Sequence, residues 1–208
     1  MSIDWPFKHI FIISIREKRL RACLKRLGPL CRYVTIIPAC NGEGINKNNW
    51  VADGSVSITS GLRRGELGCF ESHCRIWRHI VEKQLPDALI LEDDARIKPS
   101  VFLANTIRDT QLLPWDILCL GRNPHRQFDR QRINNKIVRT GEFWGLFAYI
   151  IRLKAAITLL RHPRVQTFDT PVDVLISDLN SSNELTVLAC SPELCRLVKV
   201  VSDTVGIL

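Results

Sequence analysis

A strand–helix–strand pattern at the start of the chain constrains the fold more than any other feature. Residues 9–15 form a short apolar stretch rich in β-branched side chains, which is typical of a buried strand in a parallel sheet. Apolar residues then recur at helical spacing over 20–27, and Gly28 and Pro29 end the helix. A second strand is expected at 33–37. This β-α-β opening predicts an α/β fold.

The alternation of strands and helices continues to the end of the chain. Residues 41–61, rich in Asn, Gly and Ser, are expected to form a long loop, and a basic loop is expected to follow Gly121. The remaining predicted elements are helices at 65–83, from 99 onward and at 154–160, strands at 88–91 and 115–120, an apolar segment at 143–151, and terminal elements around 185–189 and 194–201. We expect residues 1–208 to form a single domain.

Composition excludes several classes of protein. With 208 residues, 46% of them hydrophobic, the chain is not disordered. Its eight cysteines include no C-x-x-C pair, so neither a zinc ribbon nor a thioredoxin-type site is indicated, and we expect them to be reduced and structural. No secretion signal is recognised, and no apolar run approaches the roughly 20 residues of a membrane-spanning helix. We therefore expect a cytoplasmic protein.

The net charge of +8 comes from 29 basic and 21 acidic residues, and it is concentrated in two runs. Residues 16–32 hold seven basic side chains with Glu17 as the one acid, and residues 122–139 hold six with Asp129 as the one acid. Such a field attracts nucleic acids, anionic membranes or phosphorylated small molecules, and charge alone does not choose among them.

Three adjacent acids, Glu92, Asp93 and Asp94, follow the predicted strand at 88–91. Ligands of open α/β sheets bind at the carboxyl ends of the strands, so the acids lie at the expected binding edge. In an extended backbone Glu92 and Asp94 point the same way and could hold one divalent cation together. The alternative is that these acids face solvent or cap the next helix.

The segment from Gly65 to His73 is the second candidate for a ligand-binding site. Gly65 and Gly68 in the first turns of a helix each cost roughly 1 kcal/mol relative to Ala, and a ligand phosphate approaching the helix N-terminus would explain them. His73 lies on the apolar stripe of this helix, where a histidine is more often part of the core than a catalyst.

Together these segments resemble a known family. The stretch from Arg64 to Trp77, RGELGCFESHCRIW, followed by LPDALILEDD at 85–94, is similar to glycosyltransferase family 25, which includes lipopolysaccharide and collagen galactosyltransferases. The opening strand with its arginines, the segment GLFAYII at 145–151 and TPVD at 170–173 extend the resemblance over nearly the whole chain. Ser14 and Ile15 stand where the family usually has Asn-Leu, and Glu71 where an apolar residue is usual.

The resemblance implies a GT-A fold, a Rossmann-like mixed sheet flanked by helices, and a metal-dependent inverting transfer of a hexose, most commonly galactose. The donor would be a UDP-sugar, and the acceptor a glycan or lipid-linked saccharide of lipopolysaccharide or lipooligosaccharide. Mn²⁺ or Mg²⁺ would be bound by Asp94 and Glu92, with Asp173 as the first candidate for the general base and Glu142 as the second. Asp173 could equally be a helix N-cap or first-turn acid beside Pro171.

Nucleotide-sugar contacts are expected from two further segments and from the acids. The expected residues are Ser14, Ile15, Arg16, Arg19 and Arg21 after the first strand, Gly65, Gly68, Ser72 and His73 in the helix, and Glu92 and Asp93.

Two other functions remain open. A catalytically inactive nucleotide-sugar-binding or scaffold relative would share the motifs. A nucleic-acid-binding protein would explain the charge, but it predicts aromatic residues interleaved with the basic runs, and the first run has only Tyr33 nearby. We therefore expect no nucleic-acid partner. The first basic run would serve the nucleotide, and the second, including Arg126 and Arg130, the acceptor or peripheral contact with an anionic membrane at the inner face of the cytoplasmic membrane.

Overall fold

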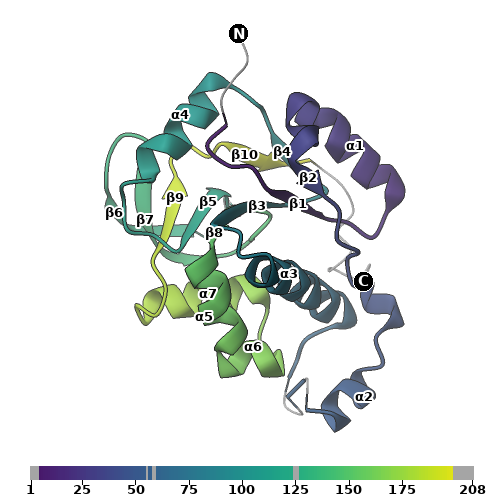
Figure 1. Cartoon of the computed structure of the whole chain (residues 1–208). Helices are drawn as coiled ribbons and strands as arrows, with labels where there is room; N and C mark the ends of the chain where they lie inside the picture. Colours follow the sequence, from purple (N-terminus) through teal and green to yellow (C-terminus); the bar gives the residue numbers. More distant parts are fainter. Residues whose placement is uncertain (1–4, 55, 58–59, 124–126, 199–208) are drawn as a thin grey trace.

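A mixed β-sheet with helices on both faces forms the centre of the molecule (Figure 1). The structure is a computed structural model, and it describes residues 5–54, 56–57, 60–123 and 127–198. The eight strands of the main sheet lie in the order β2-β1-β3-β8-β5-β9-β7-β6. Two short strands, β4 and β10, pair separately. These observations confirm the predicted Rossmann-like mixed sheet flanked by helices.

The element bounds follow the chain order. The strands are β1 (Ile10–Ile13), β2 (Val34–Thr35), β3 (Asp87–Glu92), β4 (Ala95–Ile97), β5 (Ile117–Gly121), β6 (Gln127–Arg132), β7 (Ile137–Phe143), β8 (Ala148–Arg152), β9 (Val187–Cys190) and β10 (Cys195–Leu197). The α-helices are α1 (Glu17–Leu27), α2 (Lys47–Ala52), α3 (Arg64–Glu82), α4 (Val101–Thr110), α5 (Leu153–Arg161), α6 (Pro163–Thr167) and α7 (Val172–Ser181), with short 3₁₀ turns at Gly28–Tyr33 and Gly42–Gly44.

The first half of the sheet is parallel and the second half is largely antiparallel. Strand β1 pairs in parallel with β2 and β3, and Ile13 of β1 lies opposite Glu92 of β3. Strand β8 then runs antiparallel between β3 and β5, and β9 is parallel to β5. The carboxyl ends of β1 and β3 therefore meet at one edge, which leads into α1 on one strand and carries the acidic residues on the other.

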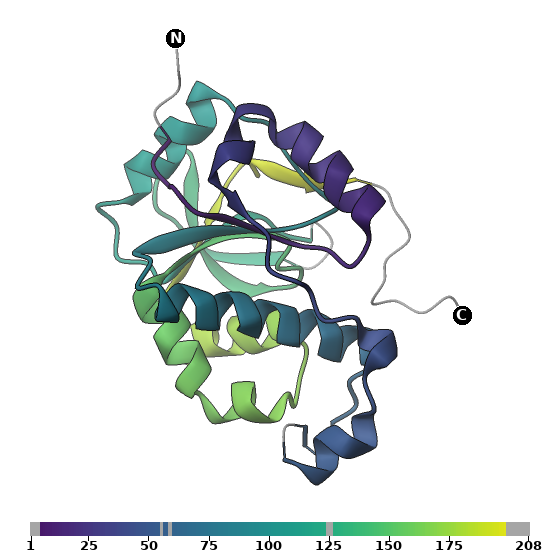
Figure 2. The same ribbon diagram turned by 45° about the vertical axis from the view of Figure 1, so that its right-hand side comes forward.

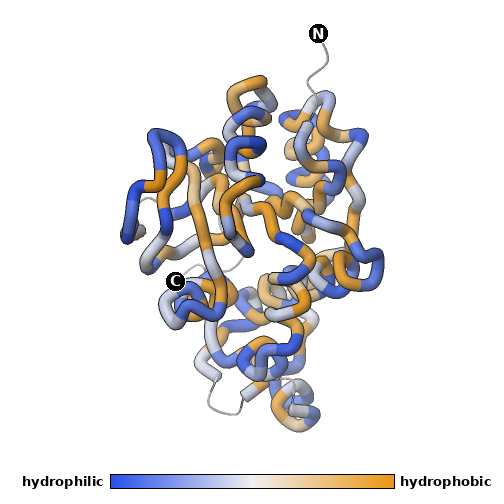
Figure 3. The backbone as a smooth tube through the Cα atoms, turned by 60° about the vertical axis from the view of Figure 1, so that its left-hand side comes forward, coloured by the Kyte–Doolittle hydropathy of each residue, from blue (hydrophilic) through white to orange (hydrophobic). Residues whose placement is uncertain are grey.

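Two apolar clusters cover the two faces of the sheet. One cluster, which includes Trp77 and Tyr149, lies between the sheet and helices α3, α5 and α7. The other, which includes Leu89 and Leu103, lies between the sheet and helices α1 and α4. Figure 2 shows α3 running along one face while α1 lies across the other. Figure 3 shows the apolar residues concentrated in the central strands. No helix among the described residues is long and apolar enough to cross a membrane.

Several predicted elements differ from the structure. The loop expected at 41–61 contains α2, and the basic loop expected after Gly121 contains most of a hairpin, β6–β7. Strand β6 escapes prediction because it is the edge strand of the sheet and carries mainly polar, exposed residues, so it has no apolar alternation. Strand β2 has two residues instead of five. All eight cysteines are free thiols, as predicted.

Candidate functional site

The three acids lie at the carboxyl end of β3, where Glu92 is the last strand residue, and they divide between the two faces of the sheet. Glu92 continues the face of Ala88 and Ile90, which belongs to the α3 side. Asp93 lies on the opposite side, where α1 packs, and Asp94 is in the turn that leads into β4. The extended backbone expected through Asp94 therefore ends at Glu92.

Asp93 holds the β1–α1 connection against the end of β3. It is nearly buried, and its carboxylate accepts a hydrogen bond from Ser14 Oγ at 2.6 Å and forms an ion pair with Arg19. Arg26 Nη2, from the last turn of α1, donates to the Asp93 carbonyl oxygen at 2.6 Å. Two residues expected to contact a nucleotide, Ser14 and Arg19, are thus brought to the acids.

The two carboxylate oxygens of Asp94 differ in their surroundings. Its Oδ2 lies 3.5 Å from Arg19 Nη2, whereas its Oδ1 is buried and has no hydrogen-bond partner among the described residues. Burial raises the pKa of Asp94, against the lowering effect of Arg19. A buried carboxylate oxygen without a partner is costly, and a bound cation would satisfy it.

Glu92 carries the most perturbed carboxyl of the three. Burial raises its pKa to about 8, and the neighbouring charges of Asp94, Asp173 and Asp93 act in the same direction. Asp173 therefore comes from a distant part of the sequence to within electrostatic reach of the acids. Crowding of this kind is relieved when a divalent cation or a proton is bound.

Asp173 is a first-turn acid of α7, as the alternative interpretation expected, and its role as a general base stays a prediction. Its Oδ2 accepts a hydrogen bond from the Gly145 N–H at 2.8 Å, and its Oδ1 accepts one from the Val174 N–H at 3.0 Å. Glu142 is exposed on β7 and shares no hydrogen bond or ion pair with the acids among the contacts of the described residues.

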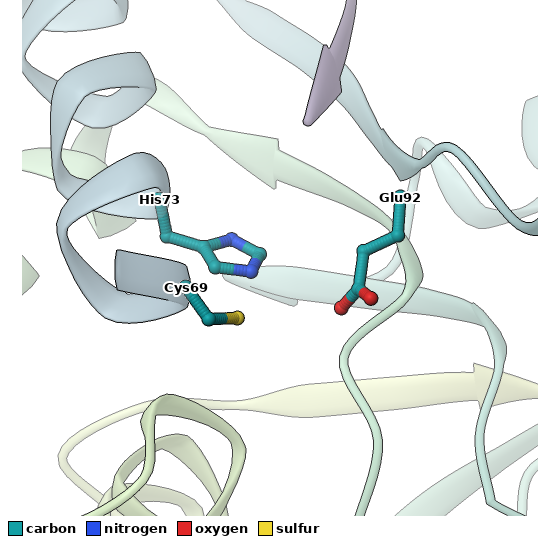
Figure 4. Close-up of side chains that lie close together, drawn as sticks. All are labelled: Cys69, His73 and Glu92. Carbon is teal, nitrogen blue, oxygen red and sulfur yellow. The ribbon is translucent and has the colours of Figure 1, made fainter. Parts of the chain in front are cut away.

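Helix α3 brings a thiol and an imidazole to Glu92. Sγ of Cys69, a ring nitrogen of His73 and a carboxylate oxygen of Glu92 all lie within 4.8 Å of one another (Figure 4). His73 is fully buried, and its Nδ1 lies 2.7 Å from the hydroxyl of Tyr149, which also accepts a hydrogen bond from Trp77 Nε1 at 3.1 Å. Burial lowers the pKa of His73 to about 3, so its ring is neutral. His73 is thus a core histidine that also borders the acids.

A close contact within the chain explains the glycine at position 68, so a ligand phosphate is not needed to explain it. A Cβ on Gly68 would lie 2.7 Å from the Gly42 nitrogen and 2.8 Å from the Cys40 carbonyl oxygen, so the chain's own backbone occupies the space beside the helix. Ser72 Oγ accepts the Cys40 N–H at 2.8 Å and holds the same segment. Gly65 Cα borders Gly42 in turn.

The remaining expected nucleotide contacts lie at the surface of α1 or just before it. Ile15 and Arg16 are exposed in the β1–α1 connection. Arg21 is 75% exposed and pairs with Glu17 one turn earlier on the same helix. Their contacts with a nucleotide, and those of the glycines, Ser72 and His73, stay predictions. Arg126 lies outside the described residues.

Two residues that lie close to the acids, Arg26 and Cys69, are not among the expected site residues. Arg26 is one of the seven basic residues of the first run, and no sequence pattern distinguishes it from the others, although its position two residues before Gly28 places it in the last turn of the helix. Cys69 is among the eight cysteines expected to be structural, although Cys and His at positions i and i+4 share one face of a helix.

The sequence is similar to those of known glycosyltransferases. Residues 7–176 match glycosyltransferase family 25, described as LPS biosynthesis proteins. Procollagen galactosyltransferase 1 of Danio rerio is 30% identical over 180 residues, covering 74% of this chain and 28% of the relative. A probable inactive glycosyltransferase 25 family member 3 of Rattus norvegicus is 30% identical over 171 residues, covering 74% of this chain and 30% of the relative. The chain thus spans less than a third of the length of these relatives.

Among solved structures, A197 from STIV is similar in fold. It aligns with a TM-score of 0.52 over 93% of this chain and 85% of that chain, at 12% sequence identity. This similarity concerns the arrangement of the sheet and helices alone.

Proposed function

Since the chain belongs to glycosyltransferase family 25, we propose that it is a metal-dependent inverting transferase that moves a hexose, in the first place galactose, from a UDP-sugar to a hydroxyl group of a glycan. The observation that carries this proposal is the acidic cluster at the end of β3, where the buried Asp94 Oδ1 has no hydrogen-bond partner in the described part of the chain. Glu92 and Asp94 fit Mn²⁺ or Mg²⁺, since both ions prefer oxygen ligands.

The residues of the site would divide the work of the transfer. A bound cation would supply positive charge to the leaving UDP diphosphate. Arg19, whose guanidinium already lies beside Asp93 and Asp94, would add a bidentate phosphate contact. Inversion requires a base on the face of the sugar opposite the leaving group. Asp173 is our candidate, because it lies within electrostatic reach of Glu92 while Glu142 is exposed.

The acceptor is proposed from chemistry. The family description names LPS biosynthesis, and the β6–β7 hairpin exposes Arg130, Arg132 and Phe128. Basic side chains beside an exposed aromatic ring suit an anionic lipid-linked saccharide and peripheral contact with a cytoplasmic membrane surface. The collagen acceptor in the names of the relatives is the competing choice.

Nucleotide binding tests the site directly. Calorimetric titration with UDP should show binding that requires Mn²⁺ or Mg²⁺, and Asp94→Ala should remove the metal-dependent part. Asp109→Asn, on an exposed acid of α4, is the matched control and should bind as the wild type does. Unchanged metal-dependent binding in Asp94→Ala would refute the assignment.

One observation favours the second candidate, an inactive nucleotide-sugar-binding relative. Arg19 lies beside two of the three acids and neutralises charge there without a cation. In an inactive relative, UDP would bind equally well in EDTA, and no hexose would be released from any UDP-sugar. Metal-dependent release of the hexose from UDP-galactose, by hydrolysis or transfer, would exclude this candidate.

A further inference from the structure

A second group of potential metal ligands lies on the α3 side of Glu92. Cys69 and His73 are one helical turn apart on α3, so both side chains point toward the end of β3 (Figure 4). Their ligand atoms and a carboxylate oxygen of Glu92 are mutually within 4.8 Å. In a tetrahedral zinc site with bonds of 2.0–2.3 Å, ligand atoms are separated by about 3.5 Å. Binding of zinc would therefore require these ligand atoms to move closer together.

His73 supplies independent support for a ligand at this position. Its Nε2 is buried and has no hydrogen-bond partner among the described residues, although the ring is fully enclosed. The Nδ1 contact with the Tyr149 hydroxyl fixes the ring orientation, and Trp77 in turn fixes Tyr149. Metal-binding histidines characteristically make such a bond through their second nitrogen. When Nδ1 carries the proton and donates it to Tyr149, Nε2 presents a free lone pair.

The electrostatic surroundings attract a cation. Burial raises the pKa of the Cys69 thiol, and the negative charges of Glu92, Asp173, Glu66 and Asp94 raise it further. A divalent cation reverses this preference, because coordination replaces the thiol proton, which is released to solvent. Cys69 and Glu92 are both partly buried residues, whereas His73 is fully buried.

We propose that Cys69, His73 and Glu92 form a site for a thiophilic divalent cation of the Zn²⁺ class, separate in ligand chemistry from the oxygen site assigned to Asp94. Thiolate and imidazole select zinc or cobalt over Mn²⁺ and Mg²⁺. Three protein ligands leave a fourth position open for water or an anion. Because Glu92 belongs to both sites, zinc bound here withdraws one carboxylate from the oxygen site.

Cobalt titration without nucleotide tests the site. The wild-type protein should bind one equivalent of Co²⁺ with a thiolate-to-cobalt charge-transfer absorption, which Zn²⁺ then abolishes. Cys69→Ser should lose this absorption and weaken Zn²⁺ binding at least tenfold, measured by competition with a chromophoric chelator. Cys40→Ser, a substitution at another half-buried cysteine, is the matched control and should keep both.

The outcomes separate this proposal from the proposed function. Thermal unfolding of Cys69→Ser in EDTA should match that of the wild type, and Mn²⁺-dependent UDP binding should persist in this variant. His73→Gln should weaken Zn²⁺ binding as Cys69→Ser does. A charge-transfer absorption that survives in Cys69→Ser, or a wild-type protein that binds no Co²⁺, would overturn the proposal whatever the result with UDP.

Discussion

The hydroxyl of Tyr149 is a single polar group whose removal has a calculable effect on the free energy of unfolding. Tyr149 lies on β8 between Ile90 of β3 and Cys119 of β5, and its side chain is fully buried. The hydroxyl contacts His73 Nδ1 at 2.7 Å and accepts from Trp77 Nε1 at 3.1 Å. Tyr149→Phe removes this oxygen and keeps the ring, so the apolar packing of the sheet is preserved.

The cost follows from the two groups left behind. Trp77 and His73 are both enclosed, so neither finds water in place of the hydroxyl. Leaving a buried polar group without a partner costs about 1–3 kcal/mol. The two groups together, less the small gain from burying a phenyl ring in place of a phenol, predict a loss of about 2–4 kcal/mol in the free energy of unfolding.

Urea unfolding, followed by tryptophan fluorescence, measures this loss as a lower midpoint with an unchanged m-value. The chain supplies a matched control in its other tyrosine. The Tyr33 ring is half-buried and receives cation contacts from Lys8 and Arg32, which do not need the hydroxyl. Tyr33→Phe should therefore unfold near the wild-type midpoint. Equal midpoints for Tyr149→Phe and Tyr33→Phe would refute the reasoning.

Three further results are expected. In metal-free buffer the free energy of unfolding should fall as pH rises from about 4.5 to about 8, because the folded chain keeps Glu92 protonated after the unfolded chain has released this proton; Glu92→Gln should flatten the pH dependence measured by urea unfolding. Gly68→Ala should cost about 1–3 kcal/mol by forcing the backbone at 40–42 away from α3, whereas Gly44→Ala, where a Cβ meets nothing within 4 Å, should cost less than 1 kcal/mol on the same assay. Arg130→Glu combined with Arg132→Glu should weaken sedimentation with anionic vesicles and leave UDP binding intact; loss of UDP binding instead would move the nucleotide to this hairpin.

Local patterns predict local structure well in this chain. The apolar spacing over 65–83 predicts α3 closely, because a long amphipathic helix repeats its signal over five turns. The order of strands in the sheet, by contrast, is not predicted by local patterns. Strand β8 inserts between β3 and β5, and this pairing joins segments about 60 and 30 residues apart in sequence. No pattern within the segment at 143–151 specifies its neighbours, because these are chosen by packing across the whole sheet.

In the candidate site, too, local features are predictable from sequence and long-range contacts are not. The position of the acidic residues at the end of a strand is predictable from sequence, because the apolar run and the acids are adjacent. The approach of Asp173 and of Cys69 to Glu92 depends on how α7 and α3 pack against the sheet. Likewise, the close contact that explains Gly68 comes from a loop, and a sequence shows only that a glycine is required there.

The division of the acids between the two faces of the sheet leads to a last prediction. Asp93 faces α1 and ties Ser14 and Arg19 to the sheet, whereas Asp94 Oδ1 has no hydrogen-bond partner within the ranges that the structure describes. Asp93→Asn breaks a nearly buried ion pair and should lower the free energy of unfolding by about 1–3 kcal/mol, because Arg19 loses its nearer partner.

Asp94→Asn should change stability in metal-free buffer by less than Asp93→Asn, because the Asp94 carboxylate lies farther from Arg19, at 3.5 Å, and removing its charge also relieves its repulsion with Asp93. The stabilisation gained on adding Mn²⁺ should show the reverse order, with Asp94→Asn losing it and Asp93→Asn keeping most of it. Thermal unfolding of both variants with and without Mn²⁺ measures the two orders. If Asp94→Asn proves the more destabilising change in EDTA, Asp94 is the structural acid and the roles assigned to the two residues are wrong.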